Sequence, residues 1–316
     1  MIQSNIAFII SHLQVVGDLP VEILPNYIFR SATDSEVEQI KKIVKESLPY
    51  GRTTWVPYDA EVVETINSIG HTSYSHAPLP KERWKYWVIA FEGQNEKIHE
   101  LQSLSRLMPI NFEIGLQLFY SEKGKKMAHI LISPYAALRY SNWDQAFGKP
   151  EIITTAQIAS IGELHKMYQN LPDQFNFVRI AVQNFSSLSD IPNGSDLVIV
   201  GLFAIIESLI THAPRLSESL DSINHQITNK IMLLRKRFSR EVLPKGYFMD
   251  AGEDKIWKKL YSYRSAVAHG TPANFEGDHQ ILKDRVTVIK FLQDNIKELI
   301  ILGLKEPEFL YDLRKC

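Results

Sequence analysis

The sequence has little cysteine, no long apolar run and almost no net charge, and each shortage excludes a class of protein. The only cysteine, Cys316, excludes a disulfide framework within one chain, which suits a reducing cytoplasm. The longest apolar run, residues 197–206, is about half as long as a membrane span, and no cationic segment precedes the apolar residues 7–10 as in a signal peptide. We therefore expect a soluble cytoplasmic protein that does not associate with membranes.

A net charge of −1 argues against a protein that coats nucleic acid through bulk electrostatics, although a local basic groove remains possible. The chain also lacks a Gly-rich phosphate loop, paired cysteines and a Gly-x-Ser-x-Gly elbow, so ATP hydrolysis, zinc fingers and serine-esterase chemistry are not expected. His71 and His76 have no nearby carboxylate or cysteine to complete a metal site. We expect neither a metal nor a cofactor.

With 316 residues and 45% hydrophobic composition, the chain can form two ordinary cores, and its two halves differ in pattern. Residues 1–150 mix helical and strand periods, which predicts an N-terminal α+β domain. We expect this domain to have a sensing or regulatory role. Residues 151–316 have only helical periods, and short polar joints predict an all-α antiparallel helical bundle. The elements expected in the first half are a helix behind the capping box Thr33–Glu36, a strand at 85–91, a helix at 94–107, and strands at 112–120 and 127–133 joined by a hairpin connection. Those expected in the second half are helices at 155–170, 174–185, 195–211, 216–239, 253–269 and 278–302.

The helix expected at residues 253–269 carries two polar side chains that its packing does not require. Asp250 to Glu253 resembles an N-cap followed by an acid, and Gly270 with Pro272 forms a C-terminal stop. Arg264 lies at the margin of the apolar stripe, where a half-buried guanidinium usually has a partner. His269 lies in the last turn, where the helix dipole favours a protonated imidazole. The apolar stripe consists of Ile256, Leu260, Tyr263 and Val267.

An arginine and a histidine that are separated by four residues at the end of a helix resemble the signature of the HEPN ribonucleases. The pattern Tyr-x2-Arg-Ser-x3-His-Gly around Arg264 is similar to the Apea-like branch of that superfamily in particular. This branch also has an apolar helix with an embedded acid two helices earlier, which corresponds here to residues 196–210 with Glu207. The resemblance covers roughly residues 154–304, and a looser one extends to residues 29–33.

The chemistry expected of these side chains is RNA cleavage without a metal. A histidine can act as general base or acid near neutral pH, and an arginine can hold a phosphate without losing its charge. Arg264 and His269 lie five residues apart and about 140° around one helix, so a two-fold dimer is expected to assemble the cleft. The resemblance likewise implies a composite site at a homodimer interface and a cyclic-phosphate product. The predicted catalytic residues are Arg264, His269, Glu207 and Ser265. At the position of Ser265, directly after the arginine, many HEPN proteins have Asn, Asp or His.

A basic cluster predicts where RNA binds. The cluster consists of Arg235, Lys236, Arg237, Arg240 and Lys245, and Phe238 inside it could stack on a base. Lys259 and Tyr261 lie next to the catalytic candidates. The alternative is that the cluster is only the solvated end of a helix whose inner face is formed by Ile227, Ile231 and Leu234.

The functional hypothesis is therefore a metal-independent endoribonuclease, with RNA as partner and an unidentified trigger bound by the N-terminal domain. Many relatives of this kind are toxins or antiphage abortive-infection effectors, and the same role is expected here. The alternative is a catalytically silent HEPN module that binds RNA or a protein partner, in which Arg264 is ion-paired and His269 only caps its helix. Glu207 either orients Arg264 or His269, or belongs to a buried polar network.

Overall fold

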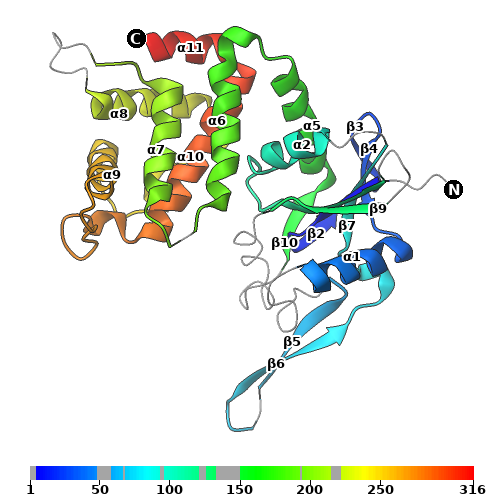
Figure 1. Cartoon of the computed structure of the whole chain (residues 1–316). Coiled ribbons are helices and arrows are strands. Elements are labelled where there is room, and N and C mark those ends of the chain that lie inside the picture. Colours follow the sequence, from blue (N-terminus) through cyan, green and yellow to red (C-terminus); the bar gives the residue numbers. More distant parts are fainter. Residues whose placement is uncertain are drawn as a thin grey trace. The chain divides into compact units, whose positions relative to one another are not determined.

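The computed structural model describes residues 5–47, 58–66, 68–92, 96–120, 126–132, 150–192, 194–214 and 222–316. The chain is α+β: a sheet-rich N-terminal region precedes a helical C-terminal region, as predicted (Figure 1). It divides into two compact units, Met1–His165 and Lys166–Cys316.

The N-terminal unit is built on a six-stranded antiparallel sheet in the order β3-β4-β7-β1-β8-β9. Two central strands, β1 and β7, are buried at every position because both faces of the sheet are covered. A separate two-stranded ribbon pairs β5 with β6, and β10 pairs in parallel with β2. The strands are β1 Asn5–Ile9, β2 Leu13–Val16, β3 Val21–Leu24, β4 Tyr27–Ser31, β5 Ala60–Ile66, β6 Thr72–Pro78, β7 Trp87–Phe91, β8 Ile114–Tyr120, β9 Lys126–Ile130 and β10 Glu151–Thr154.

One face of this sheet is covered by α1 (Asp34–Ser47), which begins with the predicted capping box. The Thr33 N–H donates to the Glu36 carboxylate over 2.7 Å, and the Glu36 N–H donates to the Thr33 hydroxyl over 3.4 Å. Behind this cap the apolar face of the helix packs on alternate residues of β1 and β7. The contributing side chains are Val37, Ile40 and Val44 from α1 with Ile6, Phe8, Val88 and Ala90 from the sheet.

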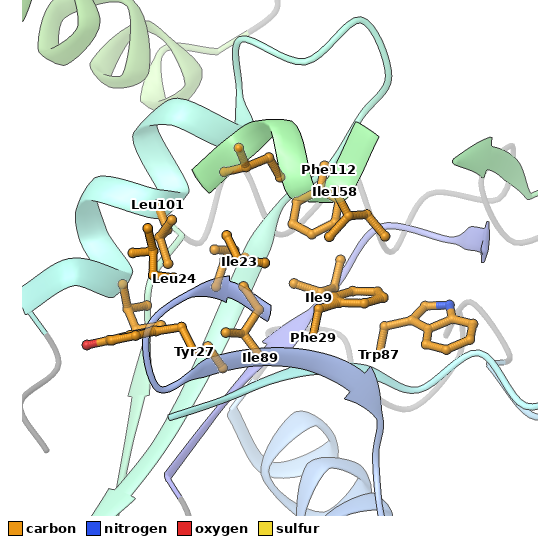
Figure 2. Packing of buried hydrophobic residues seen from close by; sticks show 14 of the residues in the cluster. Ile9, Ile23, Leu24, Tyr27, Phe29, Trp87, Ile89, Leu101, Phe112 and Ile158 are labelled. Atoms are coloured by element: carbon orange, nitrogen blue, oxygen red, sulfur yellow. The ribbon is translucent and has the colours of Figure 1, made fainter. Parts of the chain in front are cut away.

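The opposite face is covered by α2 (Glu96–Ser105) and by the first part of α5 (Thr155–Gln169). Figure 2 shows Ile158 of α5 next to Phe112, on the same side of the sheet as Ile9 and Phe29. Together with Ile153 of β10, these contacts complete the first core. The two units accordingly divide after His165 rather than near residue 151, because β10 and most of α5 pack with the strands.

The C-terminal unit is helical. At its centre lies α7, which contacts α6, α8, α9, α10 and α11, and Figure 1 shows α6, α7 and α10 running alongside one another. The apolar side chains of α7 form the middle of this core, including the fully buried Ile199, Leu202, Phe203 and Ile206. The helices are α6 Asn176–Ser187, α7 Leu197–Ile210, α8 Ile223–Leu234, α9 Glu253–Ala268, α10 Arg285–Lys305 and α11 Pro307–Lys315, with 3-10 turns η1 Lys81–Arg83, η2 Asp173–Phe175, η3 Leu188–Asp190, η4 Arg235–Arg237, η5 Pro244–Gly246 and η6 Gln280–Leu282.

Several predicted boundaries are wrong. The helix expected at 278–302 starts only at Arg285, because a 3-10 turn and Lys283 with φ of 59° precede the N-cap Asp284. The helix expected at 216–239 becomes α8, which ends at Leu234 and continues as the 3-10 turn η4. Residues 216–221 and the connection at 121–125 lie outside the described residues. Among the described helices, none is long and apolar enough to cross a bilayer.

Candidate functional site

The helix α9 places the candidate catalytic residues, and its packing follows the predicted stripe. Ile256, Trp257, Leu260 and Tyr263 are buried in the C-terminal unit, while Val267 is half-buried. The helix begins differently from the prediction, because its N-cap is Gly252 and no side chain caps it. Apolar packing, supported by acids in the first turn, therefore fixes α9 without the expected Asp250 cap.

The end of α9 forms a Schellman motif. Gly270 has φ of 71°, and its N–H donates to the carbonyl of Val267 over 3.0 Å. The N–H of Thr271 reaches back to the carbonyl of Ala266 over 2.8 Å, which completes the paired bonds of this motif. His269 is the C-cap, one residue after the last helical residue, and its side chain is exposed. The predicted stop at Gly270 is confirmed, and it leaves the imidazole at an open helix end.

Arg264 has the acidic partner that its position predicts. Its Nη2 lies 3.4 Å from Oε1 of Glu207 on α7, and the two side chains are only 28% and 23% exposed. The ring of Tyr261 also contacts the guanidinium, since Cζ of Arg264 lies 5.7 Å from the ring centroid. Tyr261 in turn meets Phe203 of α7 edge to face at 6.0 Å. The side chain of Arg264 is thus held by one carboxylate and one ring.

Burial affects the pKa of Glu207 more strongly than the charge of Arg264 does. Burial raises the pKa of Glu207 above its ordinary value, and the charge of Arg264 offsets only part of that rise. Glu207 Oε1 and Arg264 Nε are both buried and have no hydrogen-bond partner in the described part of the chain. The contact is therefore an ion pair without hydrogen-bond geometry.

The start of α7 is fixed to the same helix by a second polar contact. The hydroxyl of Tyr263 donates to Asp196 over 3.1 Å, and Arg285 Nη1 lies 3.6 Å from the same carboxylate. Burial, followed by the charge of Asp196, raises the pKa of Tyr263. Together with the Glu207 pair, this contact sets the placement of α9 against α7. Ser265 is half-buried, and its carbonyl accepts from the N–H of His269 over 3.1 Å.

The predicted basic cluster lies on η4 and the segment after it, where the structure pairs its arginines with acids. Arg235 pairs with Glu253 of α9, and Arg237 pairs with Glu306 while lying 4.3 Å from the ring centroid of Phe309. Lys236 is exposed and has no such partner among the described residues. The apolar inner face that the alternative interpretation requires is buried: it consists of Ile227, Ile231 and Leu234.

Arg240 belongs to a polar network that the sequence analysis missed. Its Nη2 donates to Asp294 over 2.8 Å and its Nε lies 3.6 Å from Glu298. The hydroxyl of Tyr247 donates to Asp294 over 2.7 Å, and burial together with this bond raises the pKa of Tyr247 to about 12. Asp294 and Glu298 are four residues apart on the buried side of α10, and two acids interrupting an apolar stripe were the available signal.

The N-terminal unit offers a pocket of about 320 Å³ beside the start of α1. Its lining includes the buried Val37 and Tyr86 together with Trp84, Lys81 and Glu82. No three His, Cys, Asp or Glu side chains converge as metal ligands within the described ranges.

Comparison of the chain with protein-family models, with curated proteins and with solved structures found no match.

Proposed function

We propose that the unit Lys166–Cys316 is an HEPN-type, metal-independent endoribonuclease. The observation that carries the proposal is the arrangement at the end of α9. Arg264 is held against Glu207, and His269 stands exposed at the C-cap five residues later. A fixed cation and a free imidazole are the two groups that RNA cleavage without a metal requires.

In the proposed reaction, His269 removes the proton from a ribose 2′-hydroxyl, and the resulting oxygen attacks the adjacent phosphorus. The bond from phosphorus to the 5′-oxygen breaks, a second imidazole protonates that oxygen, and a 2′,3′-cyclic phosphate remains. Arg264 stabilises the charge that develops on the non-bridging phosphate oxygens. Glu207 acts as a positioning residue, because it touches Arg264 and limits the directions in which the guanidinium can point.

A complete site needs two chains in this proposal. Arg264 and His269 point about 140° apart around α9, so one helix does not aim both at one phosphate. An isologous contact between two copies supplies the second histidine and the second arginine. A homodimer that cleaves cellular RNA also fits the proposed role as a toxin or antiphage abortive-infection effector.

The N-terminal unit is proposed to sense a trigger and to restrain or release the ribonuclease. Its pocket beside α1 is lined by a carboxylate, two aromatic rings and Lys81, which pairs with Asp34, and it has room for a small ligand. Residues 29–33, which carry the looser resemblance, adjoin this pocket: Ser31 and Ala32 line it.

A silent module that binds RNA or a protein partner is the second candidate. It is favoured by the same ion pair, since a guanidinium that is already paired with Glu207 can be purely structural.

The test is cleavage of total RNA by the purified full-length protein in EDTA. Cleavage that persists in EDTA and leaves cyclic phosphate ends is expected, whereas strict dependence on Mg²⁺ or Mn²⁺ contradicts the mechanism. Intact RNA under every condition, with retained RNA binding, supports the silent module.

Mixing excess chains that carry Arg264→Ala and His269→Ala into wild type, with subunit exchange verified by labelling, should lower activity more steeply than dilution. A fully active monomer contradicts the composite site.

A further inference from the structure

The outer face of α9 carries a row of cations that ends at His269. Lys255, Lys258 and Lys259 occupy the same side of the helix as His269, within about 120° of its circumference at about 100° per residue. Lys255 and Lys258 are exposed and Lys259 is half-buried. The apolar residues of the helix lie on the opposite side, so this face points away from the core.

The row runs along the helix axis and is long enough to guide a polymer. Lys255 lies about 21 Å and Lys259 about 15 Å from His269 along the axis, at about 1.5 Å of rise per residue. Ser262 is exposed and Ser265 is half-buried, and both lie on the same face, so small hydroxyl side chains separate the lysines from the imidazole. No bulky side chain of the helix stands between the two.

One acid lies beside this row, and it does not cancel the charge. Lys258 Nζ is 3.6 Å from Asp254, and both side chains are more than 60% exposed at 65% and 62%. An exposed pair of this kind is weak and is readily exchanged for another anion. Lys255 and Lys259 have no ion pair among the described residues. Two ammonium groups are therefore free, and the third is easily freed.

From this arrangement we infer that the outer face of α9 is a binding track for single-stranded RNA, whose phosphates lie on Lys255, Lys258 and Lys259 and whose scissile phosphate reaches His269. The inference rests on the proposed function for the identity of the substrate. Flexible ammonium groups suit binding to an RNA backbone of any base sequence, since they bind phosphates as point charges. A single strand, unlike a duplex, also leaves its 2′-hydroxyl free to turn toward the imidazole.

The track also limits the proposed dimer contact. Two copies of this face would repel each other through six ammonium groups, so the face is left open to solvent. The neighbouring side carries Tyr261 and Arg264, which contact α7 and stay half-buried, and the exposed Ala268, and it is the part of α9 that remains for a two-fold contact.

The test measures binding and cleavage separately on the full-length protein. Binding is followed by anisotropy of a fluorescein-labelled single-stranded RNA of mixed sequence, in the His269→Ala background, over a range of KCl concentrations. Replacing Lys255, Lys258 and Lys259 by Gln should weaken binding by at least tenfold at low salt. It should also make the log–log salt dependence shallower by about 2, since each phosphate contact with a single strand contributes about 0.7. In the otherwise wild-type chain, the same triple variant should raise KM and leave kcat within about threefold.

A charge-matched control replaces Lys166, Lys290 and Lys315, three exposed lysines of the same unit that lie outside α9 and outside the basic cluster, by Gln. This control should change affinity by less than twofold. Equal losses in the two triple variants, an unchanged affinity in the α9 variant, or no binding of single-stranded RNA by the parent protein would overturn the inference. If RNA binding depends on the α9 lysines but wild type cleaves no RNA, the binding track is supported and the ribonuclease function is contradicted. If wild type cleaves RNA and the α9 variant has an unchanged KM, the ribonuclease function is supported and the track is contradicted.

Discussion

Two basic regions of the C-terminal unit look alike in sequence and differ in structure. The cluster at Arg235–Arg240 is the densest run of cations in the chain, yet its arginines contact carboxylates of α9, of α10 and of Glu306 between α10 and α11. The three lysines of α9 lie within residues 255–259, and their face of the helix is open to solvent up to His269. Dense positive charge in a sequence therefore does not identify the surface that is free to bind an anion.

The difference has a physical cause. A guanidinium keeps its charge at every physiological pH and presents a planar fork, so it suits contacts between helices in which a carboxylate must be matched. An ammonium is strongly hydrated and flexible, and it remains at the surface. In this unit the arginines of the cluster join η4 and the segment after it to α9, to α10 and to Glu306, and the lysines of α9 remain available.

The largest expected effect is loss of cleavage on replacing the exposed imidazole. His269→Ala should reduce the rate by about 10²- to 10⁴-fold, the range for removal of a general acid or base. Because the side chain is exposed at the C-cap, the melting temperature should stay within about 2 °C. His225→Ala, at an exposed histidine of α8, is the matched control and should cut RNA like wild type. Wild-type cleavage by His269→Ala would contradict the assignment.

The second prediction concerns stability in the arginine cluster. Arg240→Ala leaves Asp294 and Glu298, which are 10% and 5% exposed, without their counter-charge. The free energy of unfolding should fall by about 2–3 kcal/mol, less than the roughly 3–5 kcal/mol of a fully buried pair because Arg240 is itself partly exposed. Denaturant titration measures this loss.

The control for Arg240 is Arg237→Ala, whose partner Glu306 is more exposed, and it should cost under about 1 kcal/mol. Adding Asp294→Asn to Arg240→Ala should recover part of the stability. If Arg240→Ala is instead as stable as wild type but binds RNA more weakly, Arg240 is an RNA ligand and the contrast between the two regions fails.

The elements that could be predicted from sequence are those whose signals are local. The capping box at Thr33 and Glu36 forms in the structure, and the stop at Gly270 forms through bonds within five residues. Periodicity places Arg264 at the margin of an apolar stripe, and it is half-buried in the structure. Only the resemblance singles out Glu207, as the acid in an apolar helix, and the structure shows that it contacts Arg264.

The remaining features depend on residues far apart in the chain. Arg240 meets an acid 54 positions away and Arg237 one 69 positions away, so local spacing gave no sign that their charges are paired. The pairing of β10 with β2 joins residues 151–154 to 13–16, which is why the division between units falls after His165. Order of strands and choice of ion-pair partner are set by tertiary packing, which a single sequence does not encode in its periodicity.

The third prediction uses the pKa of Glu207. Burial raises this pKa in the folded state, so the folded protein holds the proton more tightly than the unfolded chain does. The contribution of Glu207 protonation to the free energy of unfolding is fully present below the ordinary pKa of a glutamate. It is lost as pH rises through the raised pKa of Glu207 in the folded state. Relative to Glu207→Gln, wild type should therefore lose stability as pH rises across that acidic window. Melting temperatures across that pH range test the effect.

Arg264→Gln sharpens this measurement. Arg264 is the group that lowers the pKa of Glu207, so its removal should extend the window to higher pH. An identical pH profile for wild type and Glu207→Gln would show that the carboxylate is solvated and does not brace Arg264.

The smallest effect is expected at Lys236, the member of the arginine cluster that has no partner among the described residues. It stands beside Arg235 and Arg237, whose guanidiniums contact Glu253 and Glu306, so it is the cluster's remaining free cation in the described structure. Lys236→Gln should weaken binding of single-stranded RNA by about two- to threefold and reduce the salt slope by about 0.7, as for one phosphate contact. Lys290→Gln, at another exposed lysine, should have no effect on either quantity. If Lys236→Gln instead lowers affinity more than the triple substitution on α9 does, RNA follows η4 and not α9, because a single residue would then outweigh three. The dense cluster would in that case be the binding surface, and its ion pairs would be the scaffold that orients Lys236.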